Sequence, residues 1–210
     1  MRSSRPRPLH VYWIGGASGA GKSTIARQLA TRHGLRLYAT DDVMPDHAAR
    51  STPADSPLLT AFAGMDMDER WLHRTPQTML DTFHWFHGEG FHHVTADLAA
   101  LPAPPPVLAE GFRLLPHLVA PLLAAPEHAV WLLPTPQFRR AAFDHRGSTW
   151  KIARQTSDPE RALDNLMERE RMFTDRLRGE LARLGLHAIE VDGHLSEDEL
   201  ADHVADVFGL

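Results

Sequence analysis

The chain has 210 residues, a formal net charge of −5 and no cysteine. This length suits a single α/β domain, and the lack of cysteine excludes disulfides, thiolate zinc sites and cysteine nucleophiles. The acidic balance argues against a chain-wide nucleic-acid surface, and no window approaches the roughly 18 apolar residues of a membrane-spanning helix. We therefore expect one domain over residues 1–210, soluble and cytoplasmic, with no nucleic-acid or membrane partner and with 1–8 as a flexible arm.

The first 42 residues have the pattern of a strand, a glycine-rich loop, a helix and a second strand. The apolar run 9–14 stops at a glycine, as a buried strand does. Apolar residues then recur at helical spacing over 22–33, and Gly34 is a suitable C-terminal cap. Residues 35–40 alternate between apolar and polar. This order predicts a βαβ unit with parallel strands and a right-handed crossover.

An insertion over residues 43–100 interrupts the pattern. Its first part, 43–75, contains several prolines and no long apolar period, which predicts irregular structure or short helices. Residues 76–101 predict a helix in two pieces that breaks near Gly88-Glu89-Gly90. We expect this insertion to bind whatever small molecule the protein uses besides a nucleotide.

The rest of the chain alternates strands with helices. The predicted strands cover 107–109, 129–133 and 187–191. The predicted helices cover 114–125, a span from a Ser157 cap to Gly185, and 196–208 with Ser196 as the cap. Such alternation predicts an α/β fold in which about five parallel strands are covered by helices on both faces.

The strongest motif is the loop between the first strand and the first helix. It matches GxxxxGK[ST] in full, with glycines that turn backbone N–H groups towards phosphate oxygens and a helix that adds its positive end. Lys22 is expected to reach the β- and γ-phosphates and the Ser23 hydroxyl to ligate Mg²⁺. We therefore predict binding of ATP and Mg²⁺ by Gly16, Ala17, Ser18, Gly19, Ala20, Gly21, Lys22, Ser23 and Thr24.

The opening of the chain resembles the P-loop small-molecule kinases. The run Ile14–Thr24, followed by a helix and Ala39-Thr40-Asp41, is similar to the start of 2-phosphoglycerate kinases, gluconate and shikimate kinases, and chloramphenicol phosphotransferases. The stretch Asp66–Leu72 is also similar to part of the gluconate kinases. The resemblance implies a three-layer P-loop NTPase fold with a lid, and transfer of the γ-phosphate of ATP to a hydroxyl of a small molecule.

In that group an aspartate just after the second strand binds or deprotonates the acceptor hydroxyl, and Asp41 and Asp42 occupy that place. Both follow a strand, at the edge of an open α/β sheet where ligands bind. The resemblance implies a catalytic role for one of them, Asp42 as a substrate contact and Asp41 also as a metal ligand. A helix cap before residues 43–49 is the alternative. The choice between the two aspartates stays open, although the pattern of the group favours Asp41.

Glu110 and Arg113 follow the third strand. Many P-loop enzymes have an aspartate at the position of Glu110, so this glutamate is a candidate for a metal-bound water or for the acceptor. The glutamate departs from the usual residue, which leaves its role open. Arg113 is a candidate for binding an anionic substrate.

Two groups of arginines are further candidates. The resemblance places a lid at residues 135–156, where Arg139, Arg140, Arg146 and Arg154 could neutralise the charge of the transferred phosphoryl group. Arg146 and Arg154 are the leading catalytic candidates, and a solvated cationic helix face is the alternative. Arg70 and Arg74, in the insertion, could contact the acceptor.

Several functions remain open within this framework. The acceptor could be a sugar, a sugar acid, a nucleoside or an antibiotic-like molecule, and a nucleoside or nucleotide kinase is the nearest alternative. A P-loop NTPase coupled to a partner, or a chain that only binds nucleotide, belongs to another class. The histidine pairs His84/His87 and His92/His93 lack partners at metal spacing, so we predict no dedicated histidine metal site. The oligomeric state is not predicted.

Overall fold

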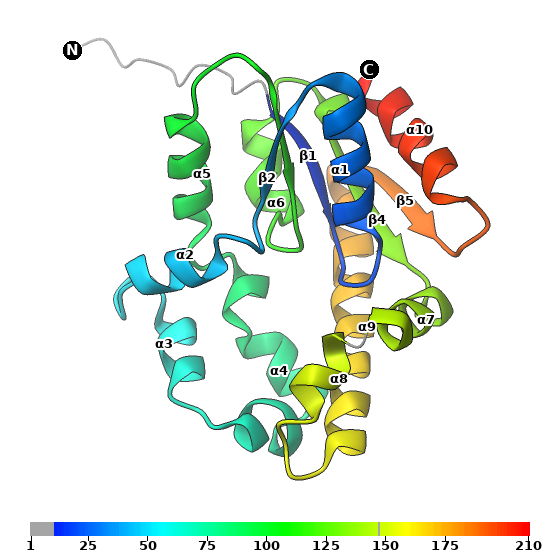
Figure 1. The fold of residues 1–210 in the computed structure, drawn as a ribbon. Helices are drawn as coiled ribbons and strands as arrows, with labels where there is room; N and C mark the ends of the chain where they lie inside the picture. The colour runs from blue at the N-terminus through cyan, green and yellow to red at the C-terminus, as the bar shows by residue number, and fades with distance from the viewer. Residues whose placement is uncertain (1–10, 147) are drawn as a thin grey trace.

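Five parallel strands form the centre of the fold (Figure 1). The computed structural model describes residues 11–146 and 148–210, so the arm 1–8 and the start of the predicted first strand lie outside the described residues. The sheet has the order β2-β3-β1-β4-β5. Its strands are β1 (Val11–Gly16), β2 (Arg36–Ala39), β3 (Val107–Glu110), β4 (Ala129–Pro134) and β5 (His187–Val191). The predicted α/β class and parallel sheet are confirmed.

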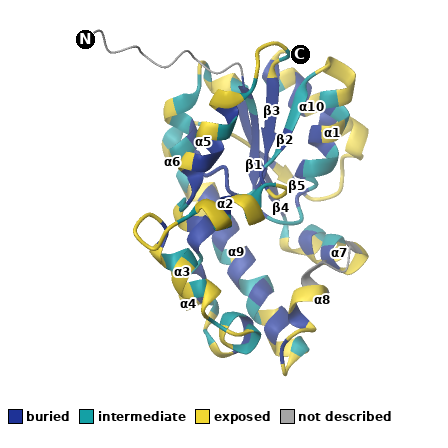
Figure 2. Cartoon of the chain, turned by 60° about the vertical axis from the view of Figure 1, so that its left-hand side comes forward, coloured by how far each residue is buried: buried dark blue, intermediate teal, exposed yellow. Residues whose placement is uncertain are grey.

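Helices cover both faces of the sheet, and the strands between them are mostly buried (Figure 2). Helices α1 (Lys22–His33) and α10 (Glu197–Phe208) pack on one face through residues such as Ile25 and Val204. The helices α5 (Phe91–Ala100), α6 (Pro116–Val119) and α9 (Pro159–Leu184) pack on the other. Because successive residues of a strand point to opposite faces, Trp13 and its neighbour Ile14 fill different cores. The continuous apolar runs of the central strands follow from this two-sided burial.

The part of the insertion before α5 lies beyond the carboxyl ends of the strands, whereas α5 itself packs on the sheet (Figure 1). Residues 43–75 form short helices, one of the two predicted alternatives: α2 (Met44–Arg50), α3 (Pro57–Ala63) and the π-helix η1 (Glu69–His73). The helix α4 (Pro76–Thr82) and the 3₁₀-helix η2 (His84–His87) follow. The predicted break is confirmed, because η2 ends at Gly88 and α5 follows Gly90, both with positive φ. The Glu89 carboxylate between them accepts hydrogen bonds from the first turn of α3.

Two helices of the structure differ from their predictions in detail. The expected helix over 114–125 is divided into α6 and the 3₁₀-helix η3 (Ala120–Leu122), because Pro121 has no amide hydrogen with which to continue the α-helical pattern. A further 3₁₀ turn, η4 (Pro126–His128), leads into β4. Helix α9 is capped by the Asp158 carboxylate, which accepts from the Arg161 amide, and the expected Ser157 cap was wrong. The Ser157 amide instead donates to Asp68 of the insertion at 2.7 Å.

The segment 135–156 forms two short helices beside the phosphate loop. These are α7 (Pro136–Arg146) and α8 (Ser148–Ala153). Phe143 is buried, while Arg140 and Arg154 are exposed. Within the described part of the chain, none of the helices is long and apolar enough to cross a membrane.

Candidate active site

The phosphate loop joins β1 to α1 and is held against β4. Gly16 has φ 123°, and a Cβ there would lie 2.1 Å from the Leu132 carbonyl oxygen, so only glycine fits. The Ala17 amide donates to that same carbonyl at 3.3 Å. Gly19 and Gly21 also have positive φ. The loop is therefore shaped by its own glycines and by β4.

Lys22 begins α1 and is buried at 8% exposure. Its Nζ donates to the Ala17 carbonyl at 2.8 Å, so the side chain lies back over the loop. Burial raises the pKa of two nearby carboxyls, Asp41 and Glu110, and the positive charge of Lys22 opposes that rise. The structure thus places the loop lysine near the two carboxylates that the sequence proposed for the metal or the acceptor.

Asp41 and Glu110 meet because their strands pair side by side. Ala39 is opposite Glu110 in the β2–β3 ladder, and the Thr40 amide donates to the Glu110 carbonyl at 2.9 Å. Glu110 is 2% exposed, and burial raises the pKa of its carboxyl against the effects of Lys22 and Ser23. Asp41 reaches solvent, yet the protein packed around its carboxyl raises its pKa too, and Lys22 and Arg113 oppose that shift. Two carboxyls at the loop are thus less acidic than usual.

A magnesium ion fits this arrangement. Mg²⁺ takes oxygen ligands, and proteins usually hold it through one or two carboxylates together with phosphate oxygens and water. Ser23, Asp41 and Glu110 supply such oxygens beside the loop, and Glu110 Oε2 is buried without a hydrogen-bond partner among the described residues. Nowhere in 11–146 or 148–210 do three or more histidine or acidic side chains form a cluster that could hold a metal by themselves. A ligand set that includes phosphate is consistent with that finding.

Arg113 is buried near Asp41, in a network that sequence reasoning did not find. One Nη contacts His47 Nδ1 at 3.0 Å, and the guanidinium lies 3.9 Å from the Trp85 ring centre. Because arginine only donates, His47 must accept at Nδ1 and donate from Nε2 to Asp97, 2.7 Å away. Burial lowers the pKa of His47, which agrees with this neutral form. Burial also lowers the pKa of Arg113 to about 10, so the guanidinium stays charged at neutral pH.

Arg169 was missed at the sequence level. It lies on α9 at 7% exposure, forms an ion pair with Glu170 at 2.5 Å, and its guanidinium carbon is 4.7 Å from the Phe83 ring centre. Among the described residues its Nε and one Nη have no hydrogen-bond partner, and neither has Glu170 Oε2. The signal was its position between Leu166 and Phe173, where helical spacing places a charge on the buried face.

A buried histidine marks the middle of this cationic region. The pKa of His84 is lowered to about 3, first by burial and then by the charges of Arg113, Arg169 and Arg70. His84 is therefore neutral at physiological pH, and the three arginines share one neighbourhood. Buried polar groups without partners need a ligand, a water or an ion to satisfy them. An acidic ligand group is one way to satisfy the donors of Arg169.

The two proposed substrate arginines of the insertion use their donors locally. Arg70 donates to the carbonyls of Phe62 and Ala63 at 3.0 and 2.9 Å, and its guanidinium lies over the Phe62 ring. Arg74 donates to the Thr78 carbonyl at 3.2 Å and to the Thr82 hydroxyl. Both side chains stabilise the folded insertion, and a contact with the acceptor stays a prediction for each.

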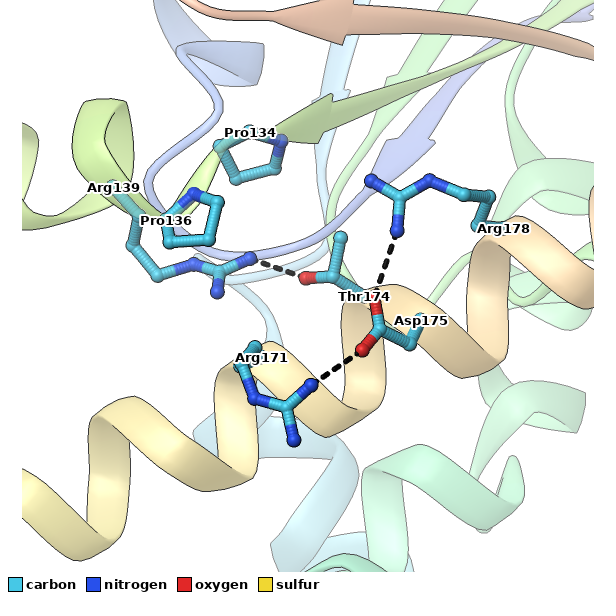
Figure 3. A pocket seen from close by; sticks show the side chains of 7 residues that line it. All are labelled: Pro134, Pro136, Arg139, Arg171, Thr174, Asp175 and Arg178. Atoms are coloured by element: carbon cyan, nitrogen blue, oxygen red, sulfur yellow. Dashed lines mark hydrogen bonds and ion pairs between the residues drawn. The ribbon is translucent and has the colours of Figure 1, made fainter.

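In the segment 135–156, which the sequence predicted as a lid, Arg139 contacts the phosphate loop. It is 1% exposed, its Nε donates to the Ser18 carbonyl at 3.2 Å, and one Nη donates to the Thr174 hydroxyl of α9 (Figure 3). Arg154 is exposed, and the side chain of Arg146 lies outside the described residues. A catalytic role for Arg146 or Arg154 stays a prediction.

The fold and the loop together define the class: a three-layer α/β protein of the P-loop NTPase type. The chain is similar to a gluconokinase from Sinorhizobium meliloti 1021 at 15% identity, with 98% of this chain and 94% of that chain covered and a TM-score of 0.47. It is similar to a deoxyadenosine kinase from M. mycoides, solved with bound dATP, at 10% identity, with 95% and 99% covered and a TM-score of 0.49. For a shikimate kinase from Acinetobacter baumannii in complex with shikimate, the identity is 16%, the coverage 95% and 92%, and the TM-score 0.42. No family model and no curated protein matches the chain.

Glu110 gives a prediction about stability. Its pKa in the folded protein lies above the ordinary 4.5, so ionisation of Glu110 opposes folding, and the effect begins as pH rises above that value. We expect Glu110→Gln, with Mg²⁺ chelated, to raise the melting temperature at about pH 8 and to leave it unchanged near pH 4. The exposed Glu127 provides the control, and Glu127→Gln should change neither value. Equal melting temperatures of Glu110→Gln and the parent protein at both pH values would contradict a raised pKa of Glu110 in the folded protein.

Proposed function

We propose that the protein is an ATP- and Mg²⁺-dependent phosphotransferase that moves the γ-phosphate to a hydroxyl of a small molecule in the cytoplasm. The observation that carries this proposal is the arrangement at the carboxyl ends of β2 and β3. There the loop lysine lies beside two carboxyls with raised pKa values, and the buried Arg113 lies near one of them, Asp41. An enzyme that only hydrolysed a triphosphate would need no cationic region on the acceptor side.

The proposed roles follow from charge and position. The loop amides and Lys22 bind the phosphates, and Ser23 with Glu110 holds Mg²⁺, which would neutralise charge on the β- and γ-phosphates. Asp41 orients the acceptor hydroxyl and takes its proton, with Asp42 in the same turn as the alternative. The raised pKa of Asp41 suits this role, because a base works best when its pKa lies nearer the working pH. Catalysis then consists of positioning and electrostatic stabilisation.

The buried cations favour an acceptor with an acidic group. Arg113 is held by His47 and Trp85, and Arg169 has donors without partners among the described residues. A carboxylate or phosphate would supply the missing partners through charge-assisted hydrogen bonds. Among the acceptors that the sequence leaves open, a sugar acid or a phosphorylated molecule fits these groups better than a neutral sugar. A nucleoside or nucleotide kinase remains the alternative.

We further propose that residues 135–156 act as a lid whose arginine for the transferred phosphate is Arg139. We expect Arg139→Ala to lower kcat by about 10²-fold or more, because a cation is lost where charge develops in the transition state. The neighbouring Arg140 is exposed, so Arg140→Ala serves as the matched control. Steady-state kinetics of both variants, with Arg154→Ala in parallel, would measure the difference. A larger loss in Arg154→Ala than in Arg139→Ala would assign the role to Arg154 instead.

A screen for the acceptor tests the proposed function directly. Purified protein is incubated with labelled ATP, Mg²⁺ and a library of hydroxylated metabolites that includes neutral sugars and their acids. We expect slow ATP turnover that one class of acceptor accelerates, with label transferred to the acceptor. ATP hydrolysis that no acceptor accelerates would favour an NTPase coupled to a partner. Saturable binding without any turnover would favour a protein that only binds nucleotide.

A further inference from the structure

A charged cavity lies beside the phosphate loop, on the side of α9. It has a volume of about 260 Å³ and opens between the start of α7 and the middle of α9 (Figure 3). Its polar lining consists of Arg139, Arg171, Thr174, Asp175 and Arg178. The four residues from α9 recur at spacings of three and four, which places them on one face of the helix. Three guanidinium groups and a single carboxylate therefore line one small space.

Arg139 contributes a buried charge to this cavity. It is 1% exposed, and no carboxylate of the described residues lies within ion-pair distance of its guanidinium. Its two hydrogen bonds go to neutral oxygens, the Ser18 carbonyl and the Thr174 hydroxyl. Buried charges in proteins are normally paired with an opposite charge. Glu170 and Asp175 act on Arg139 from farther away and raise its pKa against the effect of burial, so an anion in the cavity would add the direct counter-charge that these two carboxylates do not provide.

The single carboxylate of the lining, Asp175, forms only exposed ion pairs. Asp175 is shared between Arg171 and Arg178, with one oxygen 2.7 Å from each, and its side chain is 51% exposed. Exposed ion pairs of this kind stabilise little, so an incoming anion can replace Asp175 at small cost. Glu168 and Glu190 pair with the outer edges of the same two guanidinium groups. These glutamates orient the arginines, and they also limit the affinity that a singly charged anion could reach.

We propose that this cavity is a second anion site, which takes a small dianion between Arg139, Arg171 and Arg178. Its volume lies below the roughly 300–1,000 Å³ of pockets for drug-sized ligands, which favours a phosphate group or a short dicarboxylate over a whole nucleotide. Two negative charges match the two arginines that Asp175 now bridges. The site is distinct from the phosphate loop, because its lining comes from the end of β4, the start of α7 and α9, and includes no residue of the loop.

The site is connected to catalysis through Arg139. This side chain reaches the Ser18 carbonyl on one side and the cavity on the other. An anion in the cavity would hold the Arg139 guanidinium there and withdraw its charge from the triphosphate. The ligand would then inhibit phosphoryl transfer without competing with ATP. This consequence rests on the proposed function, whereas binding of the anion does not.

Calorimetric titration tests the binding. Inorganic phosphate and, separately, succinate are titrated into full-length protein that carries Lys22→Ala, so that the phosphate loop is not the main anion site. We expect binding that Arg178→Ala weakens by about tenfold or more, because a charge-assisted contact is lost. Asp175→Asn removes the competing carboxylate and should tighten binding. Arg176→Ala is the matched control, since Arg176 is exposed on the same helix but outside the lining, and it should have no effect.

The outcomes separate the alternatives. Binding of phosphate alone, or of succinate alone, supports the site and identifies the dianion. Binding of both supports it as a general dianion site. Equal affinities in the Arg178→Ala and Arg176→Ala backgrounds, or no binding once Lys22 is replaced, would overturn the proposal. Titration is independent of turnover, so a protein without kinase activity that still binds the anion would contradict the proposed function and leave the cavity site standing.

Discussion

Replacing Lys22 with alanine is expected to lower the rate of phosphoryl transfer by about 10³-fold while the protein stays folded. In the structure the ammonium group lies over the phosphate loop, and its charge favours the ionised forms of Asp41 and Glu110. In the transition state it would face charge that develops between the β- and γ-phosphates, where a fixed cation stabilises most. Single-turnover kinetics with the identified acceptor would measure the loss, and circular dichroism would show whether the fold is retained.

Arg183→Ala is a suitable control for the Lys22 variant. Arg183 is an exposed cation near the end of α9, and its pairing with Glu180 at 3.8 Å is a surface contact. Its replacement removes one positive charge from the chain without touching the loop, so transfer should continue at the parental rate. If Lys22→Ala also transferred phosphate at close to the parental rate, the kinase proposal would have to be abandoned.

The second large effect is expected at Asp41. Asp41→Asn should lower kcat by about 10²–10⁴-fold with little change in the KM for ATP, because a positioned general base contributes on that order. Its pKa is raised above the ordinary 3.8, and the base acts only when ionised. The rate should therefore fall, as pH decreases, at a higher pH than an ordinary aspartate would give. That acid limb of the pH profile should be absent in Asp41→Asn.

Asp42→Asn provides the matched control, one residue along the same turn. The amide of Asp42 donates to the Ala39 carbonyl at 3.3 Å, a backbone contact that the substitution leaves in place. We expect Asp42→Asn to retain most of the activity and the acid limb of the pH profile. A deep loss in Asp42→Asn with near-normal activity in Asp41→Asn would reverse the assignment. Full activity in both variants would show that neither aspartate is catalytic and that the pair only forms a turn.

The correct predictions concern features that depend on residues close together in the chain. The phosphate loop, the βαβ opening, the Gly34 and Ser196 caps and the break at Gly88 and Gly90 all follow from local backbone preferences. The number and direction of the strands followed as well, since alternating strands and helices leave parallel pairing as the natural arrangement. The Ser157 cap failed because Asp158 competes for the same role, and local rules do not rank the two.

Tertiary structure alone decided which charged side chains gather at the site. Arg139 rather than Arg140 meets the loop because of the phase of α7, and its contact with Ser18 joins residues 121 positions apart. Arg113 and His47 are 66 positions apart, and neither the neutral form of His47 nor the burial of Arg113 has a signature in the sequence. Arg169 lies at the site because α9 packs against the aromatic rings of the insertion. Long-range packing sets the solvation of each charge, and solvation determines which charges a ligand must satisfy.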